Sequence, residues 1–179
     1  MKTIFVVACL MISIGALGKG DKVDFPRPFE FTLLDSVQGT KADLYIKAYD
    51  WIAKNFNSAN NVIQMQDKEA GKFIIKGIIP YSVHGLMGNK VGKEYIHFTM
   101  SISVKDGRYK CVIYDFYHEA GIVNGSVSYG SLDKEAPHKA LEQGWMNKRW
   151  ADIKATAQNG AEDLLLSLKK SMGAKDDNW

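Results

Sequence analysis

The sequence predicts a single α+β domain with the element order β-α-β-β-β-β-α, an antiparallel sheet, and both helices packed on one face of that sheet. Two segments with apolar residues at helical spacing, 41–55 and 146–172, enclose a region of short alternating stretches separated by turn signals. Within that region, Asp106-Gly107 predicts a tight hairpin turn. Because each helix has one apolar stripe, a sheet with one apolar face satisfies both helices and leaves its other face open.

The first 18 residues, MKTIFVVACLMISIGALG, have the layout of a secretory signal peptide: a lysine, an apolar run and then small residues. We expect cleavage after Gly18 and a periplasmic or extracellular location. Lipid attachment at Cys9 is the alternative, because VVAC resembles a lipobox, although it would leave a short apolar run before the cysteine. No later stretch is long enough for a transmembrane segment, which needs roughly 20 apolar residues.

Charge and cysteine content restrict the partners and the covalent structure. Loss of Lys2 with the signal peptide changes the formal net charge from +3 to +2. Charges of both signs are interspersed along the chain, which argues against a nucleic-acid partner. Cys111 is then the only cysteine, so no disulfide can form within the chain. We expect an extended segment at 19–27, one domain at 28–173 and a tail at 174–179.

The elements follow from local patterns. A first strand is expected at 28–36, and a helix at 41–55 begins after Thr40, with Asp43 three residues on as in a capping box. Four more strands are expected, at 61–66, 72–83, 94–105 and 108–118. The last helix, at 146–172, contains Gly160 as a weak point.

Three connections are expected to be irregular or tight. In DKEAGKFIIKG we expect Gly71 to supply the positive φ of a hairpin corner, and not to cradle a phosphate. Residues 84–93 predict a surface loop. Residues 119–144, rich in Gly and Ser, predict a long loop, which a short helix at 137–144 would shorten.

The turn at Asp106-Gly107 fixes the expected register of the hairpin, starting with Lys105 opposite Arg108. The pairs farther from the turn are Ser103 with Lys110, Ser101 with Val112, Thr99 with Tyr114, His97 with Phe116, and Tyr95 with His118. The core face then carries Ile96, Phe98, Met100, Ile102, Val104, Tyr109, Cys111, Ile113, Asp115 and Tyr117. Asp115 is the misfit among them, and we expect it at the sheet margin, bonded to a backbone amide or a lysine.

Three stretches resemble a known family: LYIKAYDWIAKNF, VIQMQDKEAGKFIIKG and FTMSISVKDGRYKCVIYDF. They are similar to the secreted Bacteroidota proteins grouped as domain of unknown function 4468, whose fold is described as similar to one half of the TATA-binding protein. The resemblance covers residues 29–116. Its matching features are Trp51, the corner at 69–71, Gly77 and the turn at 106–107. These positions carry the fold, so the resemblance implies no catalytic residue.

No catalytic motif accompanies this fold. His97 and His118 are expected as diagonal neighbours on the open face, but no third ligand is at hand, and we expect no metal and no cofactor. The serines lack a nucleophile elbow. The stretch GNKVGKE has neither the glycine spacing nor the following helix of a phosphate-binding loop.

The sequence therefore favours a non-enzymatic binding or interaction domain of the cell envelope that uses its open sheet face. The expected contact residues on that face are Tyr95, His97, Tyr114, Phe116 and His118. The alternative is an envelope hydrolase with its site between this face and the 119–144 loop. The expected partner is a protein or small-molecule ligand in the envelope, or a second copy of the chain in a homo-oligomer.

Overall fold

The computed structural model describes residues 25–84, 90–121, 127–135 and 144–174. The elements in chain order are β1 (Phe31–Ser36), α1 (Lys41–Asn55), α2 (Ala59–Val62), β2 (Ile63–Asp67), β3 (Lys72–His84), β4 (Lys90–Lys105), β5 (Arg108–Glu119), β6 (Gly130–Ser131) and α3 (Gly144–Gly173). All strands pair antiparallel in one sheet with the order β1-β5-β4-β3-β2, and β6 pairs with β5.

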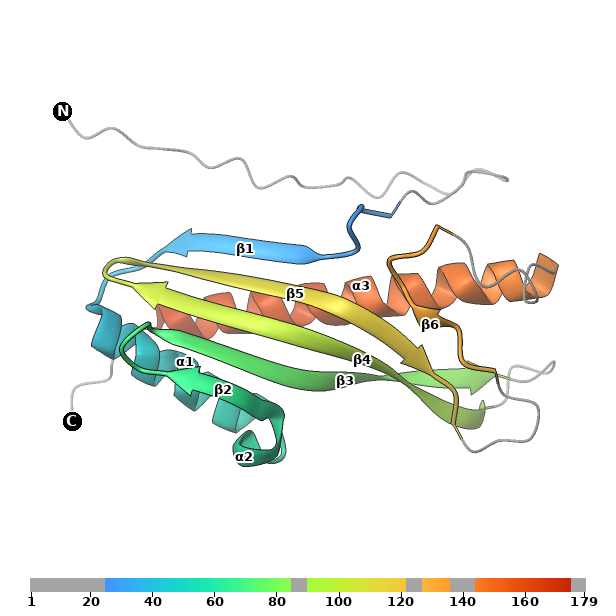
Figure 1. Cartoon of the computed structure of the whole chain (residues 1–179), viewed down its shortest axis with the longest axis horizontal. Coiled ribbons are helices and arrows are strands. Elements are labelled where there is room, and N and C mark those ends of the chain that lie inside the picture. The colour runs from blue at the N-terminus through green and yellow to red at the C-terminus, as the bar shows by residue number, and fades with distance from the viewer. Residues whose placement is uncertain (1–24, 85–89, 122–126, 136–143, 175–179) are drawn as a thin grey trace.

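Both long helices pack on one side of this sheet. In Figure 1 the helices lie behind the strands, and α3 runs along the length of the sheet. We call this side the covered face and the opposite side the open face. The predicted α+β class, element order and helix placement are confirmed.

Several expected bounds shift. The first strand begins at Phe31 and not at residue 28, and the one-turn helix α2 occupies the expected start of the second strand. Strand β4 already begins at Lys90, so much of the loop expected at 84–93 is strand. Residues 85–89, between β3 and β4, lie outside the described part of the chain.

Helix α1 begins as the sequence predicts. The side chain of Thr40 accepts a hydrogen bond from the backbone N–H of Asp43, and the Asp43 carboxylate accepts one from the backbone N–H of Thr40 at 3.0 Å. This reciprocal pair satisfies two backbone donors that a helix start otherwise leaves free. The buried side of α1 consists of Leu44, Ala48, Trp51 and Ile52. Trp51 also donates from Nε1 to Ser167 Oγ on α3 at 3.0 Å, which joins the two helices.

Glycines allow close approach at two places on the covered face. A Cβ on Gly160 of α3 would lie 2.8 Å from Ile79, so the residue expected to weaken the helix is the one that lets α3 rest on β3. A Cβ on Gly77 would lie 2.3 Å from the Phe98 ring, which therefore fills the space over that glycine. At the β2–β3 corner, Gly71 has φ +65°, as predicted.

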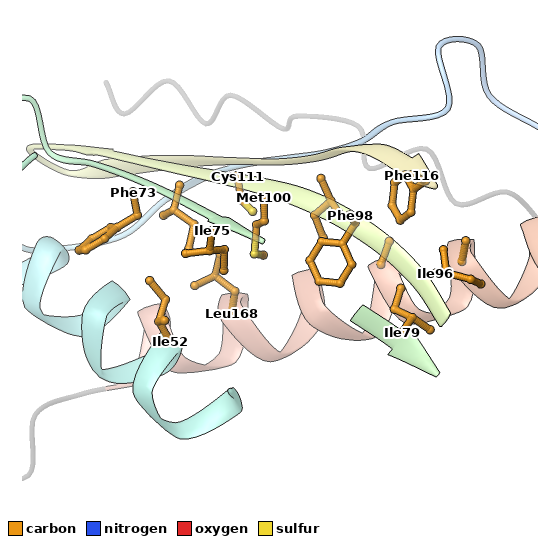
Figure 2. Close-up of a cluster of buried hydrophobic side chains, with 14 of the residues drawn as sticks. Ile52, Phe73, Ile75, Ile79, Ile96, Phe98, Met100, Cys111, Phe116 and Leu168 are labelled. Carbon is orange, nitrogen blue, oxygen red and sulfur yellow. The ribbon is translucent and has the colours of Figure 1, made fainter. Parts of the chain in front are cut away.

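The core lies between the sheet and the two helices. Figure 2 shows side chains from α1, β3, β4, β5 and α3 meeting there, with Phe98 and Phe116 on the same side of the sheet. Cys111 is fully buried among them, and burial raises the pKa of its thiol. The cysteine is therefore a packed apolar residue, as expected.

The segment expected as a long loop at 119–144 contains structure. Residues 130–131 form β6, which pairs Ser131 with Tyr117 and Gly130 with His118. Tyr129 and Leu132 on either side are buried in the core. Residues 122–126 and 136–143, which include nearly all of the short helix expected at 137–144, lie outside the described residues.

Candidate functional site on the open sheet face

The five predicted contact residues divide between the two faces. Tyr95, His97 and Tyr114 lie on the open face; Tyr95 is 38% exposed, and the His97 side chain is 44% exposed. Phe116 and His118 lie on the covered face and are 1% and 0% exposed. Their expected placement on the open face is wrong. The expected core residues Asp115 and Tyr117 are exposed instead.

A β-bulge in β5 explains the exchange. The predicted pairs from Lys105–Arg108 to Thr99–Tyr114 are all present, but the next pair is His97 with Tyr117 and not with Phe116. Strand β5 thus contains one extra residue, and every side chain beyond it changes face. Asp115 sits at the bulge with φ +58°, a left-handed conformation that is uncommon for a residue with a side chain.

The bulge adjoins a depression of about 380 Å³ on the open face. It is lined by Lys76, Gly77, His97, Phe98, Thr99, Asp115, Tyr117 and Glu119. His97 Nε2 lies 2.7 Å from Glu119 Oε2, and the Thr99 hydroxyl donates weakly to Asp115 at 3.4 Å. Two carboxylates, an imidazole and an amine therefore converge beside an exposed phenol.

Sequence reasoning missed Asp115, Tyr117 and Glu119 as members of this site. The expected register assigned Asp115 and Tyr117 to the core, and it ended before Glu119. The available signal was Asp115 itself, because a carboxylate in an otherwise apolar alternation indicates an irregularity in the strand.

A second cluster of polar side chains lies on the covered face, between the sheet and α3. Glu94 of β4 is fully buried; its Oε2 lies 2.9 Å from His118 Nε2 and 2.5 Å from Arg149 of α3. The backbone N–H of Tyr129 donates to His118 Nδ1 at 3.2 Å, which leaves Nε2 to carry the proton that is donated to Glu94. Glu94 Oε1 has no partner among the described residues.

Burial lowers the pKa of His118, against the opposing effect of Glu94. A neutral imidazole between β4, β5 and the segment before β6 holds these elements together. Because Glu94 and His118 are fully buried, we interpret the cluster as part of the core that supports the fold.

The expectation that His97 and His118 are diagonal neighbours on the open face is also wrong. The two histidines lie on opposite faces of the sheet, because the bulge separates them. No group of three His, Cys, Asp or Glu side chains that could hold a metal ion occurs among the described residues. The side chains of His84 and His138 lie outside them.

A shallow groove of about 480 Å³ lies away from this site, beside α1 and β2. Its lining residues are Tyr45, Ile46, Tyr49, Gln66 and Lys68. Tyr45 stacks on Phe73 with ring centroids 4.3 Å apart, so part of the groove wall is anchored to the core.

Comparisons with known proteins agree with this architecture. Residues 34–119 match the family model described as "Domain of unknown function (DUF4468) with TBP-like fold". The resemblance expected over 29–116 is thus confirmed for residues 34–116, as a domain of unknown function with a TATA-binding-protein-like fold. No curated protein matches the chain.

Two solved structures are similar to the chain. One is a DUF4468 family protein from Bacteroides ovatus, with 16% identity and a TM-score of 0.59, covering 84% of this chain and 89% of that one. The other is a TBP-like protein from Parabacteroides distasonis, with 12% identity and a TM-score of 0.55, covering 79% and 92%. At these identities the likeness concerns the fold alone.

Proposed function

We propose that the protein is an exported, non-enzymatic binding module whose ligand contacts the open face around the depression at the β5 bulge. The observation that carries this proposal is the set of exposed apolar and aromatic side chains beside that depression. Ile78, Tyr95 and Tyr117 are 55%, 38% and 47% exposed. Register places Ile78, His97 and Tyr117 in one row across three strands, with Tyr95 and Glu119 in the next.

These residues combine two kinds of contact. Clustered apolar side chains on a surface that no described helix covers favour a contact role, since leaving them in water costs free energy. The carboxylates of Asp115 and Glu119 add hydrogen-bond acceptors at the rim of the same depression. The left-handed backbone at Asp115 supports the proposal, because such strain is concentrated at functional sites.

Export is supported by the N-terminal sequence alone. Its lysine, apolar run and small residues predict a signal peptide. No helix in the described part of the chain is long and apolar enough to cross a membrane.

The alternative, an envelope hydrolase with a site between the open face and the 119–144 segment, gains no support from the described residues. Tyr129 and Leu132 of that segment turn into the core, away from the depression. The depression holds the His97–Glu119 pair, but no serine or cysteine is among its lining residues.

Ligand screening by nuclear magnetic resonance tests the binding proposal. Isotope-labelled protein is titrated with a panel of saccharides, peptides and small aromatic acids, and perturbed resonances are mapped on the structure. We expect perturbations at Tyr95, His97 and Tyr117. The double variant Tyr95→Ala/Tyr117→Ala should lose them while retaining its fold.

Ile46→Ala/Tyr49→Ala is the matched control, because it removes two exposed side chains from the groove beside α1. Perturbations that persist in the Tyr95/Tyr117 variant, or that map to the α1 groove, would contradict the proposal. Sedimentation of the same samples at several concentrations shows whether a second copy of the chain occupies the face.

A further inference from the structure

The half of the open face nearest the β4–β5 turn carries four cationic side chains. Lys72 of β3, Lys105 of β4, and Arg108 and Lys110 of β5 alternate with buried residues and therefore point outward. None of the four has an ion-pair partner among the described residues. The nearby carboxylate of Asp106 already accepts a hydrogen bond from the backbone N–H of Lys41 at 2.6 Å.

Protection of a sheet edge does not explain these cations. Exposed edge strands often carry lysine, which discourages pairing with another chain. Here β3, β4 and β5 all have neighbours on both sides, because β1 and β2 form the edges. Lys105 directly opposes Arg108, an arrangement of like charges that destabilises a hairpin. A ligand of opposite charge would remove that repulsion.

Hydroxyl groups lie close to the cations. Ser103 stands between Lys72 and Lys110 in one row, and Ser36 pairs with Arg108. The next row contains Ser101, with Thr32 on β1. Neighbouring strands are about 4.8 Å apart, so the cations are spaced roughly 5 to 10 Å from one another across the sheet. The surface combines these positive charges and hydroxyls with the apolar side chains of Leu34, Ile74 and Val112, and Asp67 of β2 opposes Lys72 at one side of it.

We propose that this basic half of the open face binds an acidic polysaccharide, a chain of sugars that carries carboxylate or sulfate groups. Such a polymer offers repeating anions to the four cations and hydroxyls to the nearby serines and threonine. The proposal rests on the proposed function, because it names the ligand class of the same open face.

Two other polyanions fit this surface less well. Binding of a single nucleic-acid strand relies on aromatic side chains on which bases stack. The outward positions around the four cations are Ser, Thr, Val, Ile and Leu, with Asp67 opposite Lys72, and none of them is aromatic. Membrane-surface binding depends on apolar and aromatic groups that enter the interface beside the cations. The exposed Tyr95 and Tyr117 lie at the opposite end of the strands from the β4–β5 turn.

Calorimetric titration of the purified chain with polygalacturonate and with sulfated heparin fragments tests the inference. We expect binding that weakens as salt rises, and an affinity loss of about tenfold or more in the variant Lys72→Gln/Lys105→Gln/Arg108→Gln/Lys110→Gln. The control replaces Lys54, Lys68, Lys148 and Lys170 by Gln, which removes the same total charge from exposed positions elsewhere. It should change the affinity by less than about threefold.

Three outcomes would overturn the inference: no binding of either polysaccharide, equal losses in the two quadruple variants, or tighter binding of oligodeoxythymidine or phosphatidylglycerol vesicles than of both polysaccharides. Ligands that still perturb Tyr95 and Tyr117 in that case would leave the proposed function standing. If no compound perturbs Tyr95, His97 or Tyr117 while the polysaccharides bind through the four cations, the contact site around the depression is wrong and the basic half alone is the binding surface.

Discussion

The β4–β5 hairpin has two halves, one near the turn and one beyond Asp115. The turn determines which side chains face the core in the first half, and tertiary packing determines it in the second. Near the turn, each outward residue pairs as the Asp106-Gly107 geometry dictates, and Tyr109, Cys111 and Ile113 enter the core. Beyond Asp115 the alternation is reversed, so that Phe116 and His118 are buried and Tyr117 and Glu119 face outward. One inserted residue therefore decides which side chains form the core and which form the candidate site.

This difference shows how far a local turn can determine a strand. The turn sets the register as long as the ladder continues without interruption. Far from the turn, the packing partners of the side chains determine it. Phe116 makes edge contacts with Phe29 and Phe31 at centroid distances of 5.2 and 5.7 Å, and His118 meets Glu94 and Tyr129.

Truncation of the adjacent Phe116 and Tyr117 gives the largest expected contrast, because these two residues of the far half lie on opposite faces of the sheet. Phe116→Ala should lower the free energy of unfolding by about 3–5 kcal/mol, because it opens a cavity in a packed aromatic cluster. Tyr117→Ala should change the free energy of unfolding by about 0.5 kcal/mol, since its side chain is half exposed. Urea unfolding measures both. If the larger loss occurred in Tyr117→Ala, the hairpin would have the register that the turn alone predicts.

The pH dependence of the free energy of unfolding tests whether His118 is buried in the far half. Because burial lowers the pKa of His118 in the folded state, the unfolded chain takes up a proton below a pH of about 6.5 that the folded chain does not. The stability that neutral His118 contributes is complete above that pH and is lost as the pH falls.

In His118→Gln, the decrease in unfolding free energy between pH 7.5 and 5.5 should be smaller than in the wild type by about 1 kcal/mol. Denaturant titrations at the two pH values measure it. An identical decrease in both proteins would show that the imidazole is not held neutral in the core.

Substitution of the bulge residue is expected to have a smaller effect than truncation of Phe116. With φ +58°, Asp115 lies in a region that β-branched residues avoid, so Asp115→Val should lower the free energy of unfolding by about 1 kcal/mol. Asp115→Gly should match or slightly exceed the wild type, because glycine adopts this conformation without strain. Thermal unfolding of the two variants tests this order. Equal stability of both would mean that the backbone at 115 is not left-handed in solution.

Much of the fold could be predicted because its signals are local. The Thr40–Asp43 capping box marked the start of α1, and the apolar spacing of Leu44, Ala48 and Ile52 marked its buried side. Periodicity likewise indicated α3. The packing role of Gly160, which lets α3 approach Ile79, could not be predicted, because it depends on a tertiary contact. The pairing of β6 with β5 escaped prediction because a two-residue strand has no recognisable period.

The part of the candidate site that could be predicted also depends on local signals. Tyr95 and His97 were placed correctly because they belong to β4, which alternates without a break through Glu94–Lys105. Phe116 and His118 were misplaced because the side of β5 on which they lie depends on residues distant in the sequence, such as Phe29, Glu94 and Tyr129.

The sequence by itself determined the class of fold, both long helices, the β4–β5 turn and the side chains of the turn-proximal half, including its four cations. These depend on periodicity, capping and turn chemistry, which act over a few residues. Only the tertiary structure decided the far half, where an aromatic cluster and a buried Glu94–His118–Arg149 group require inward positions for Phe116 and His118. Strand β5 accommodates these inward positions through the bulge at Asp115, and the bulge exposes Tyr117 and Glu119 at the depression.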